Sequence, residues 1–141
     1  MNRIAQVHDF SGKGMGLAAP QIDLDHAIAV VRSALRDSAD ESIVLINPRI
    51  TFVSSETDEK HEGCLSFFDV RGLVPRPLQI TVESQTLSGE TRVECYEHGL
   101  ARLIAHEIDH LDGLLYNSRM RPGVAPIPVA EYRGTGRAWA Y

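Results

Sequence analysis

The chain has little of what marks several large classes of protein. Its 141 residues contain no apolar run long enough to span a bilayer. Met1 to Gly12 has no apolar core of a signal peptide. Basic residues form no patch or run, and the formal net charge is −5, which argues against nucleic-acid binding. We therefore expect a cytoplasmic protein without a membrane or nucleic-acid partner. Cysteine is also scarce, so a thiolate ligand has only two candidates.

The length suits a single domain, residues 1–141, with a core large enough to stand alone. Short apolar or alternating segments predict five strands ahead of one helix: 27–31, 43–46, 50–53, 78–87 and 91–96. The last two are predicted to form a hairpin through Ser88-Gly89. Polar segments 37–42 and 54–62 are predicted loops, and the Pro- and Gly-rich tail from Arg119 an irregular arm. Strands followed by a central helix indicate an α+β fold.

The segment from His106 to His110 spells H-E-x-x-H. Histidines four residues apart project from one helical face, so both imidazoles can bind one metal ion. Glu107 can then take a proton from a metal-bound water. Apolar residues at three- and four-residue steps support a helix that ends before Gly113: Leu100, Leu103, Ile104, Ile108 and Leu111. We predict a metal-binding helix from about Glu97 to Leu111; the alternative is a surface helix that carries two histidines by chance.

A catalytic metal usually has a third protein ligand. Tyr116 stands where metzincin proteases have their third histidine, and prolines before Glu131 argue against a thermolysin-like site. Cys95 lies in an alternating segment and is predicted to be a small core residue. Cys64 lies in a polar segment beside a glycine, which suits a thiolate ligand. His61 offers a further candidate, although a histidine between charged residues is more often solvated.

These segments together resemble the peptide deformylases, which carry three motifs in a fixed order. The first is a glycine-rich stretch that ends in Ala-Ala-Pro-Gln, here residues 14–21. The second is E-G-C-x-S at 62–66, and the third is H-E-x-D-H-L-x-G at 106–113. Residues 71–76, Arg-Gly-Leu-Val-Pro-Arg, match a further family segment. The resemblance covers the chain from about Gly14 onwards. It implies antiparallel strands packed around a central metal-binding helix.

The resemblance also implies a metal site. Its ligands are Cys64, His106 and His110, with an open position for water. The family usually holds Fe²⁺ in the cell, and Zn²⁺ or Ni²⁺ can substitute, because borderline metals accept both sulfur and imidazole. Glu107 matches the family's general acid/base, whereas Asp109 orients a ligand histidine or caps neighbouring backbone.

The implied reaction removes the N-formyl group from the initiator methionine of nascent polypeptides at the ribosome, releasing formate. The donors to the oxyanion are the side-chain amide of Gln21 and the backbone N–H of Leu65. The substrate peptide would lie along three residues of the glycine-rich stretch and two residues near the cysteine: Gly14, Met15, Gly16, Gly63 and Arg71.

Two features depart from the family pattern. Most bacterial members have a helical segment before the glycine motif, where this sequence offers Met1 to Lys13, so we expect a short or divergent member. Ala105 stands where glutamine commonly precedes the first histidine, which alters the surroundings of the metal ligands. Three other functions stay open: a deformylase-like enzyme for a small N-formyl metabolite, a non-enzymatic peptide-binding relative, and a metallopeptidase that cleaves ordinary peptide bonds.

Overall fold

The computed structural model describes residues 16–32, 42–64 and 67–134. The elements follow in this order: β1 (Gly16–Ala18), η1 (Ala19–Ile22), β2 (Ile28–Arg32), β3 (Ser42–Val53), β4 (Thr57–Cys64), β5 (Phe67–Pro77), β6 (Gln79–Gln85), β7 (Thr91–Glu97), α2 (His98–Leu111), η2 (Tyr116–Arg119), β8 (Ile127–Pro128) and α3 (Val129–Gly134). Strands precede the long helix, so the predicted α+β class is confirmed.

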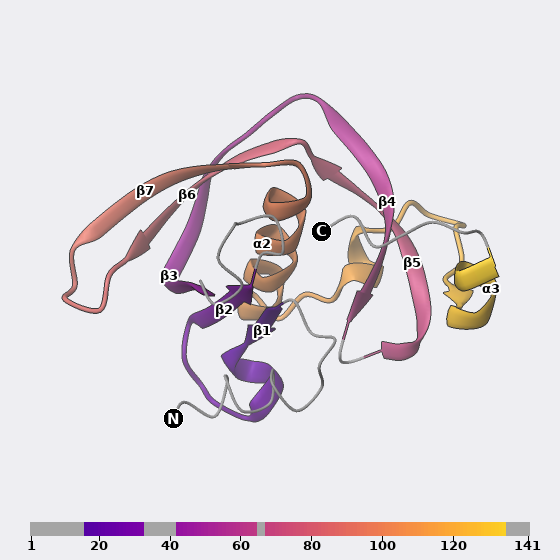
Figure 1. Ribbon diagram of the computed structural model, residues 1–141, viewed down its shortest axis with the longest axis horizontal. Coiled ribbons are helices and arrows are strands. Elements are labelled where there is room, and N and C mark those ends of the chain that lie inside the picture. Colours follow the sequence, from indigo (N-terminus) through magenta and orange to yellow (C-terminus); the bar gives the residue numbers. More distant parts are fainter. Residues whose placement is uncertain (1–15, 33–41, 65–66, 135–141) are drawn as a thin grey trace.

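The strands form two antiparallel sheets on either side of α2. The larger has the order β1-β2-β3-β6-β7 and the smaller has the order β4-β5-β8. In Figure 1, β3 and β4 form an arch, and α2 lies beneath it with β6 and β7 on one side and β5 on the other. This arrangement places the end of β4, which carries the candidate thiolate, opposite the helix that carries both histidines.

Helix α2 is more deeply buried than one apolar stripe predicts. Every residue from Ala101 to His110 is buried, including the charged ones. Its predicted bounds are confirmed, with Glu97 as the N-cap and Asp112 as the C-cap. The helix packs on a cluster of buried apolar side chains from the larger sheet: Ala18, Ala29, Val31, Ile43, Leu45, Ile80, Val82 and Tyr96. Over the described ranges, the structure contains no helix long and apolar enough to cross a membrane.

Strand β3 joins two segments that the sequence separates. The predicted strands 43–46 and 50–53 are continuous, because the Asn47-Pro48 break is absorbed as an irregularity in the pairing with β6 between Ile46 and Arg49. Asn47 adopts a left-handed conformation with a φ of 48°, which asparagine tolerates better than most residues. Its side-chain amide donates a hydrogen bond to Gln85 at 2.8 Å, so β3 stays paired at the irregularity.

Two predictions of irregular structure are wrong. Residues 54–62 were expected to be a loop because they are polar, yet β4 begins at Thr57 and pairs with β5 along its length. One of the polar residues of this strand, Glu62, is buried and accepts hydrogen bonds from Arg76 and Arg102, so its polarity does not indicate a loop. The tail after Arg119 was expected to be irregular, yet Ile127 and Pro128 pair with Arg71 and Val70 of β5, and α3 follows. Residues 37–41 and 135–141 lie outside the described part of the chain.

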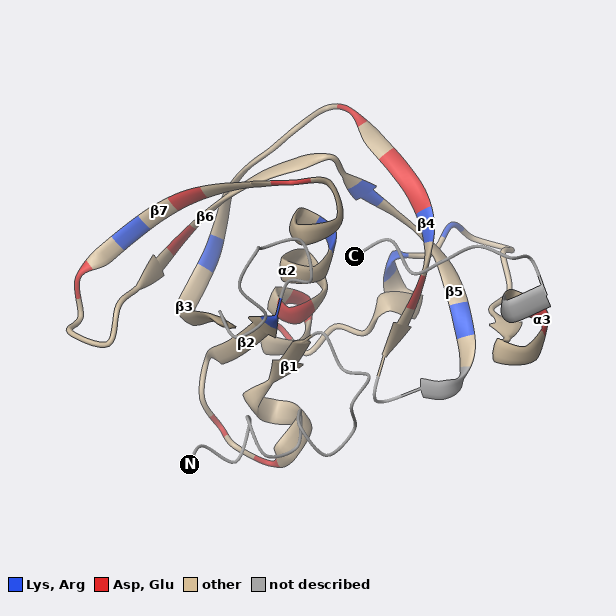
Figure 2. Ribbon diagram, in the orientation of Figure 1, with Lys and Arg blue, Asp and Glu red and all other residues tan. Residues whose placement is uncertain are grey.

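The β6–β7 hairpin is confirmed, with Gly89 in its turn at a φ of 86°. The prediction that Cys95 belongs to the core is wrong, because it is exposed together with Val93. The alternation was identified correctly, but α2 covers the opposite face of this strand, where Tyr96 is buried. Figure 2 shows a basic segment on β3, an acidic segment on β6, and both kinds on β7.

Candidate functional site

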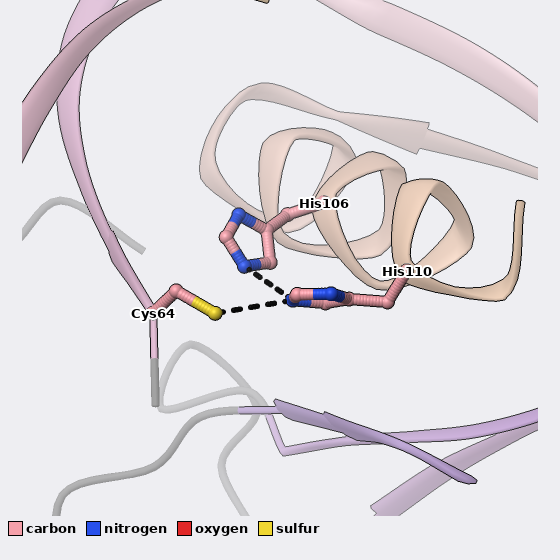
Figure 3. A group of neighbouring side chains, drawn as sticks. All are labelled: Cys64, His106 and His110. Atoms are coloured by element: carbon pink, nitrogen blue, oxygen red, sulfur yellow. Dashed lines mark hydrogen bonds between the residues drawn. The ribbon is translucent and has the colours of Figure 1, made fainter. Parts of the chain in front are cut away.

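Three potential metal-binding atoms converge between the end of β4 and the buried helix. The Nε2 atom of His110 lies 3.2 Å from the Sγ atom of Cys64 and 3.1 Å from the Nε2 atom of His106. All three atoms lie within 4.8 Å of one another. Figure 3 shows the thiol of Cys64 from β4 and the two imidazole rings from α2 pointing toward one another. The structure therefore brings together the three predicted ligands, although Cys64 precedes His106 by 42 residues in the sequence.

The chemistry and spacing of this group fit one divalent ion. Ligand atoms around a tetrahedral zinc lie roughly 3.3–3.6 Å apart, given bonds of about 2.0–2.1 Å to nitrogen and about 2.3 Å to sulfur. The observed separations are slightly shorter, so small side-chain movements would open the group to its ion. One thiolate and two imidazoles leave a fourth position for water, as in catalytic zinc sites. The same donor set accepts iron and nickel, so the residues do not by themselves select a metal.

Glu107 is buried beside this group with one carboxylate oxygen lacking a partner. Its exposed fraction is 3%, and no hydrogen bond to Oε2 is found within the described residues. A buried acceptor without a partner is costly unless a water or ligand satisfies it. Burial raises the pKa of Glu107 to about 7, against the opposing effect of His106 and His110. A carboxyl group with this pKa can both accept and release a proton near neutral pH.

The space around Glu107 depends on Gly16 in β1. A Cβ atom at this position would stand 2.5 Å from Oε1 of Glu107 and 2.8 Å from both Cδ and Cγ. Gly16 pairs with Val31 in regular antiparallel register, and its φ is not in the positive range that favours glycine. Glycine is therefore required here for the close approach of the carboxylate to the backbone, rather than for an unusual conformation.

The side-chain amide of Gln21 contacts the sulfur of Cys64. Its Nε2 atom donates to the Sγ atom of Cys64 at 3.6 Å, and its Oε1 atom accepts from the backbone N–H of Ala18 at 2.9 Å. The second contact fixes which end of the amide faces the metal-binding group. The structure thus places an N–H donor of Gln21 beside the Cys64 sulfur, at the edge of the metal-binding group. Sequence analysis predicted this donor from the resemblance alone.

The side chain of Glu62 fixes the orientation of His106. Its Oε1 atom lies 3.0 Å from Nδ1 of His106, a spacing in which the ring N–H donates and Nε2 is left to bind metal. Glu62 is fully buried and also accepts from Arg76 and Arg102. Burial would raise its pKa, but hydrogen bonds from His106 and Arg76 outweigh this and lower it to about 2. Glu62 is therefore a buried carboxylate that holds a histidine in one tautomer.

The ion pairs around Glu62 extend through Arg76 to Asp109 of α2. Arg76 donates from Nη1 to Asp109 at 2.7 Å, and Arg119 donates to the same carboxylate at 2.7 Å. Asp109 therefore binds arginines, and among the described residues its side chain makes no contact with a ligand histidine and no cap, the two roles expected for it. Arg102 links two carboxylates of β4: its Nη1 atom lies 2.6 Å from Oε2 of Glu62, and its Nη2 atom lies 2.8 Å from Oδ1 of Asp58. Arg76 and Arg102 join α2 to the β4–β5 hairpin, and Arg119 joins α2 to η2.

Sequence analysis missed most of this network. Glu62 and Arg76 were recognised only as letters of motifs, because the contact between them depends on the hairpin pairing. For Arg102 a signal was available, since it precedes His106 by four residues, as His106 precedes His110. Residues at this spacing share a helical face. Arg102 could therefore have been placed next to the two histidines.

The other predicted site residues have varied surroundings. Gly63 precedes the thiolate in β4, and Arg71 in β5 donates to the carbonyl of Val70 at 2.9 Å. His61 is not part of the metal-binding group and packs against Tyr132, with ring centroids 5.3 Å apart. Ala105 is buried in the core cluster. Three further residues lie outside the described ranges: Gly14, Met15 and Leu65.

Comparisons with known proteins agree with this geometry. A curated peptide deformylase from Acidobacterium capsulatum is 43% identical over 79% of this chain and 65% of its own length. Peptide deformylase 2 from Clostridium perfringens is 40% identical over 77% of this chain and 68% of its length. The chain thus spans about two thirds of the length of these relatives.

Solved structures give the same result. A Met-Ala-Ser-bound class I type b peptide deformylase from Acinetobacter baumannii superposes with a TM-score of 0.75 and 33% identity, covering 83% of this chain and 76% of that one. Arabidopsis thaliana peptide deformylase 1B in complex with an inhibitor superposes with a TM-score of 0.78 and 33% identity, covering 86% of this chain and 66% of that one. The family model described as polypeptide deformylase matches residues 1–125, which include the thiolate, both histidines and Glu107. This chain therefore belongs to the polypeptide deformylase family.

Proposed function

We propose that this protein is a metal-dependent hydrolase that removes the N-formyl group from the initiator formyl-methionine of polypeptides. Family membership and the relatives' names support this substrate class. The single structural observation that carries the proposal is the buried Glu107 carboxylate, whose Oε2 atom has no hydrogen-bond partner in the described part of the chain, beside the Cys64, His106 and His110 group. The metal ligands are these three residues, and the whole of 1–141 forms one catalytic domain.

A divalent ion bound to the three ligands would supply an acidified water and positive charge beside the formyl carbonyl. Glu107 accepts the proton as the water oxygen bonds to the formyl carbon. It then delivers that proton to the amine nitrogen as the carbon–nitrogen bond breaks. One water and one formyl amide thus become formic acid and a free N-terminal amine, and the carboxylate returns to its starting state. Near neutral pH the acid gives its proton to the amine, so the products are formate and an N-terminal ammonium group.

The negative charge that develops on the formyl oxygen needs donors already in place. Gln21 supplies one through its Nε2 amide, which Ala18 holds in a fixed orientation. The backbone N–H of Leu65 supplies the second in this proposal. The peptide lies along the backbone of β1 and beside β5, in contact with these residues: Gly14, Met15, Gly16, Gly63 and Arg71.

The same proposal covers the cellular setting. The metal is Fe²⁺, as the family resemblance implies. Zn²⁺ or Ni²⁺ can substitute, because the thiolate and imidazole donors accept all three. The compartment is the cytoplasm, whose reducing conditions keep the Cys64 thiol free to bind metal. The substrates are formyl-methionyl peptides that emerge from the ribosome.

The test is anaerobic measurement of formate release, with metal analysis of the same sample. Three substrates distinguish the alternatives: formyl-Met-Ala-Ser, free formylated small molecules, and the unformylated peptide. We expect rapid formate release from the first, slow release from the second, and no cleavage of the third. Preferred turnover of small formylated molecules would favour a metabolic enzyme. Cleavage of the unformylated peptide would favour a peptidase, and the absence of any formate from metal-loaded protein would contradict the proposal.

A further inference from the structure

Tyr116, in the short helix η2, packs against the candidate ligand His106. Its exposed fraction is 2%, and the two rings are stacked, with centroids 6.3 Å apart and planes inclined by 26°. Tyr116 lies outside the E-G-C-x-S and H-E-x-D-H-L-x-G motifs. Nothing in the proposed reaction uses it, so its burial beside a metal-binding ring needs its own explanation.

The position of Tyr116 depends on a glycine across from it. A Cβ atom at Gly72 in β5 would stand 2.3 Å from Cε2 and 2.9 Å from Cδ2 of Tyr116, and 2.7 Å from Sδ of Met120. Gly72 is not among the glycines with a positive φ, so the backbone would accept another residue. The restriction is one of space. Strand β5 therefore lacks a side chain at the point where the tyrosine ring lies.

Gly72 is also the pairing partner of Glu62 in the β4–β5 hairpin. Glu62 binds the Nδ1 edge of the His106 ring, at 3.0 Å. The hairpin therefore contacts His106 in two ways, directly through Glu62 and indirectly through the tyrosine ring that lies on Gly72. A single hydrogen bond at a ring edge leaves the ring free to tilt about that bond. A second aromatic ring packed on its face restricts the tilt.

We propose that Tyr116 is a positioning residue, which holds the His106 ring so that Nε2 points at the metal, and that Gly72 creates the space for it. This inference rests on the metal ligation in the proposed function. The aromatic face carries the effect, so phenylalanine at position 116 should preserve it. An aliphatic side chain would fill part of the space without presenting a flat face to the imidazole.

The test uses cobalt(II) as the probe, with no substrate present. Competition with a chromophoric chelator gives the affinity, and the absorption bands of the cobalt protein report ligand geometry. Removing outer partners of metal ligands typically weakens binding about 10–100-fold. We expect Tyr116→Leu to bind cobalt about 10-fold more weakly with shifted bands, and Tyr116→Phe to restore both to near the parent values.

Tyr132→Leu is the matched control. Tyr132 is also buried and also contacts a histidine, His61, which is outside the metal-binding group. Its replacement should lower the thermal unfolding temperature and leave cobalt affinity and spectrum unchanged. Equal losses of cobalt affinity in Tyr132→Leu and Tyr116→Leu would overturn the proposal, because general loosening would then explain both.

Gly72→Ala keeps the proposal testable if Tyr116→Leu fails to fold. The added methyl should displace the tyrosine ring, weaken cobalt binding and shift the spectrum. In the Tyr116→Leu background the loss should be smaller than in the parent, because residues in contact couple. In the Tyr116→Phe background, which keeps the ring, the loss should match that in the parent. An alanine at 72 that leaves the cobalt spectrum unchanged would refute the positioning role. Failure of the parent protein to bind cobalt would instead contradict the proposed metal site, so the two outcomes are distinguishable.

Discussion

Replacing Gly16 with alanine should slow catalysis without removing the metal. The added Cβ would stand 2.5 Å from Oε1 of Glu107, whereas ordinary contacts of this kind lie at about 3.4–4 Å. The carboxylate must therefore move by on the order of 1 Å, since it is the flexible partner and β1 is held by pairing with β2. A displacement of about 1 Å in a catalytic group can cost about 10²-fold in rate. We expect kcat to fall by about that factor.

The variant should remain folded, because Gly16 has no positive φ and overpacking typically costs about 1–3 kcal/mol. Metal content should match the parent, since the three heavy atoms nearest to the new methyl group all belong to Glu107 and none to the three candidate ligands. Formate release from formyl-Met-Ala-Ser and metal analysis test both expectations. In a Glu107→Gln background, Gly16→Ala should cost little more, because both changes act through one side chain. A Gly16→Ala protein with parent kcat, or with lost metal, would refute this reasoning.

Four further substitutions, one of them a control, test the separate parts of the site. Cys64→Ala should abolish tight metal binding, whereas Cys95→Ala should leave metal content unchanged and, at an exposed position, change the free energy of unfolding by no more than about 0.5 kcal/mol. Gln21→Leu should lower kcat by about 10²–10³-fold while metal content is retained, as measured by formate release. Glu62→Gln should weaken metal binding about 10–100-fold, because His106 loses its charged partner. The same variant should lower the free energy of unfolding measured in urea by about 3–5 kcal/mol, because two buried arginines lose their carboxylate.

The local elements of the fold were largely predictable. The 3.6-residue periodicity and the glycine after it located α2, and the alternation on both sides of Ser88-Gly89 located the β6–β7 hairpin. Strand β4 was not predictable by the same reasoning, because its polar residues resemble those of a loop. Glu62 is a charged side chain in a fully buried position, and its hydrogen bonds with arginines from α2 and β5 compensate for the loss of water.

Residue burial was less predictable than strand location. Cys95 alternates with Tyr96 as a strand residue should, but the sequence does not say which face of β7 meets α2. The candidate ligands were found because the motifs name them. The surrounding contacts, including those of Asp109 with Arg76 and Arg119, depend on tertiary packing. Arg76 and Asp109, for example, are 33 positions apart in the sequence, and no local pattern predicts that they meet.

The measurement that tests the account most directly is formate release by Glu107→Gln, together with its metal content. Glutamine keeps the shape of the side chain and removes its ability to accept a proton. We expect parent-like metal content, because Glu107 is not one of the three converging ligands. We expect turnover of formyl-Met-Ala-Ser to fall by at least the roughly 10²–10⁴-fold typical of a positioned acid/base. A variant that keeps its metal and releases formate at the parent rate would contradict the proposed mechanism.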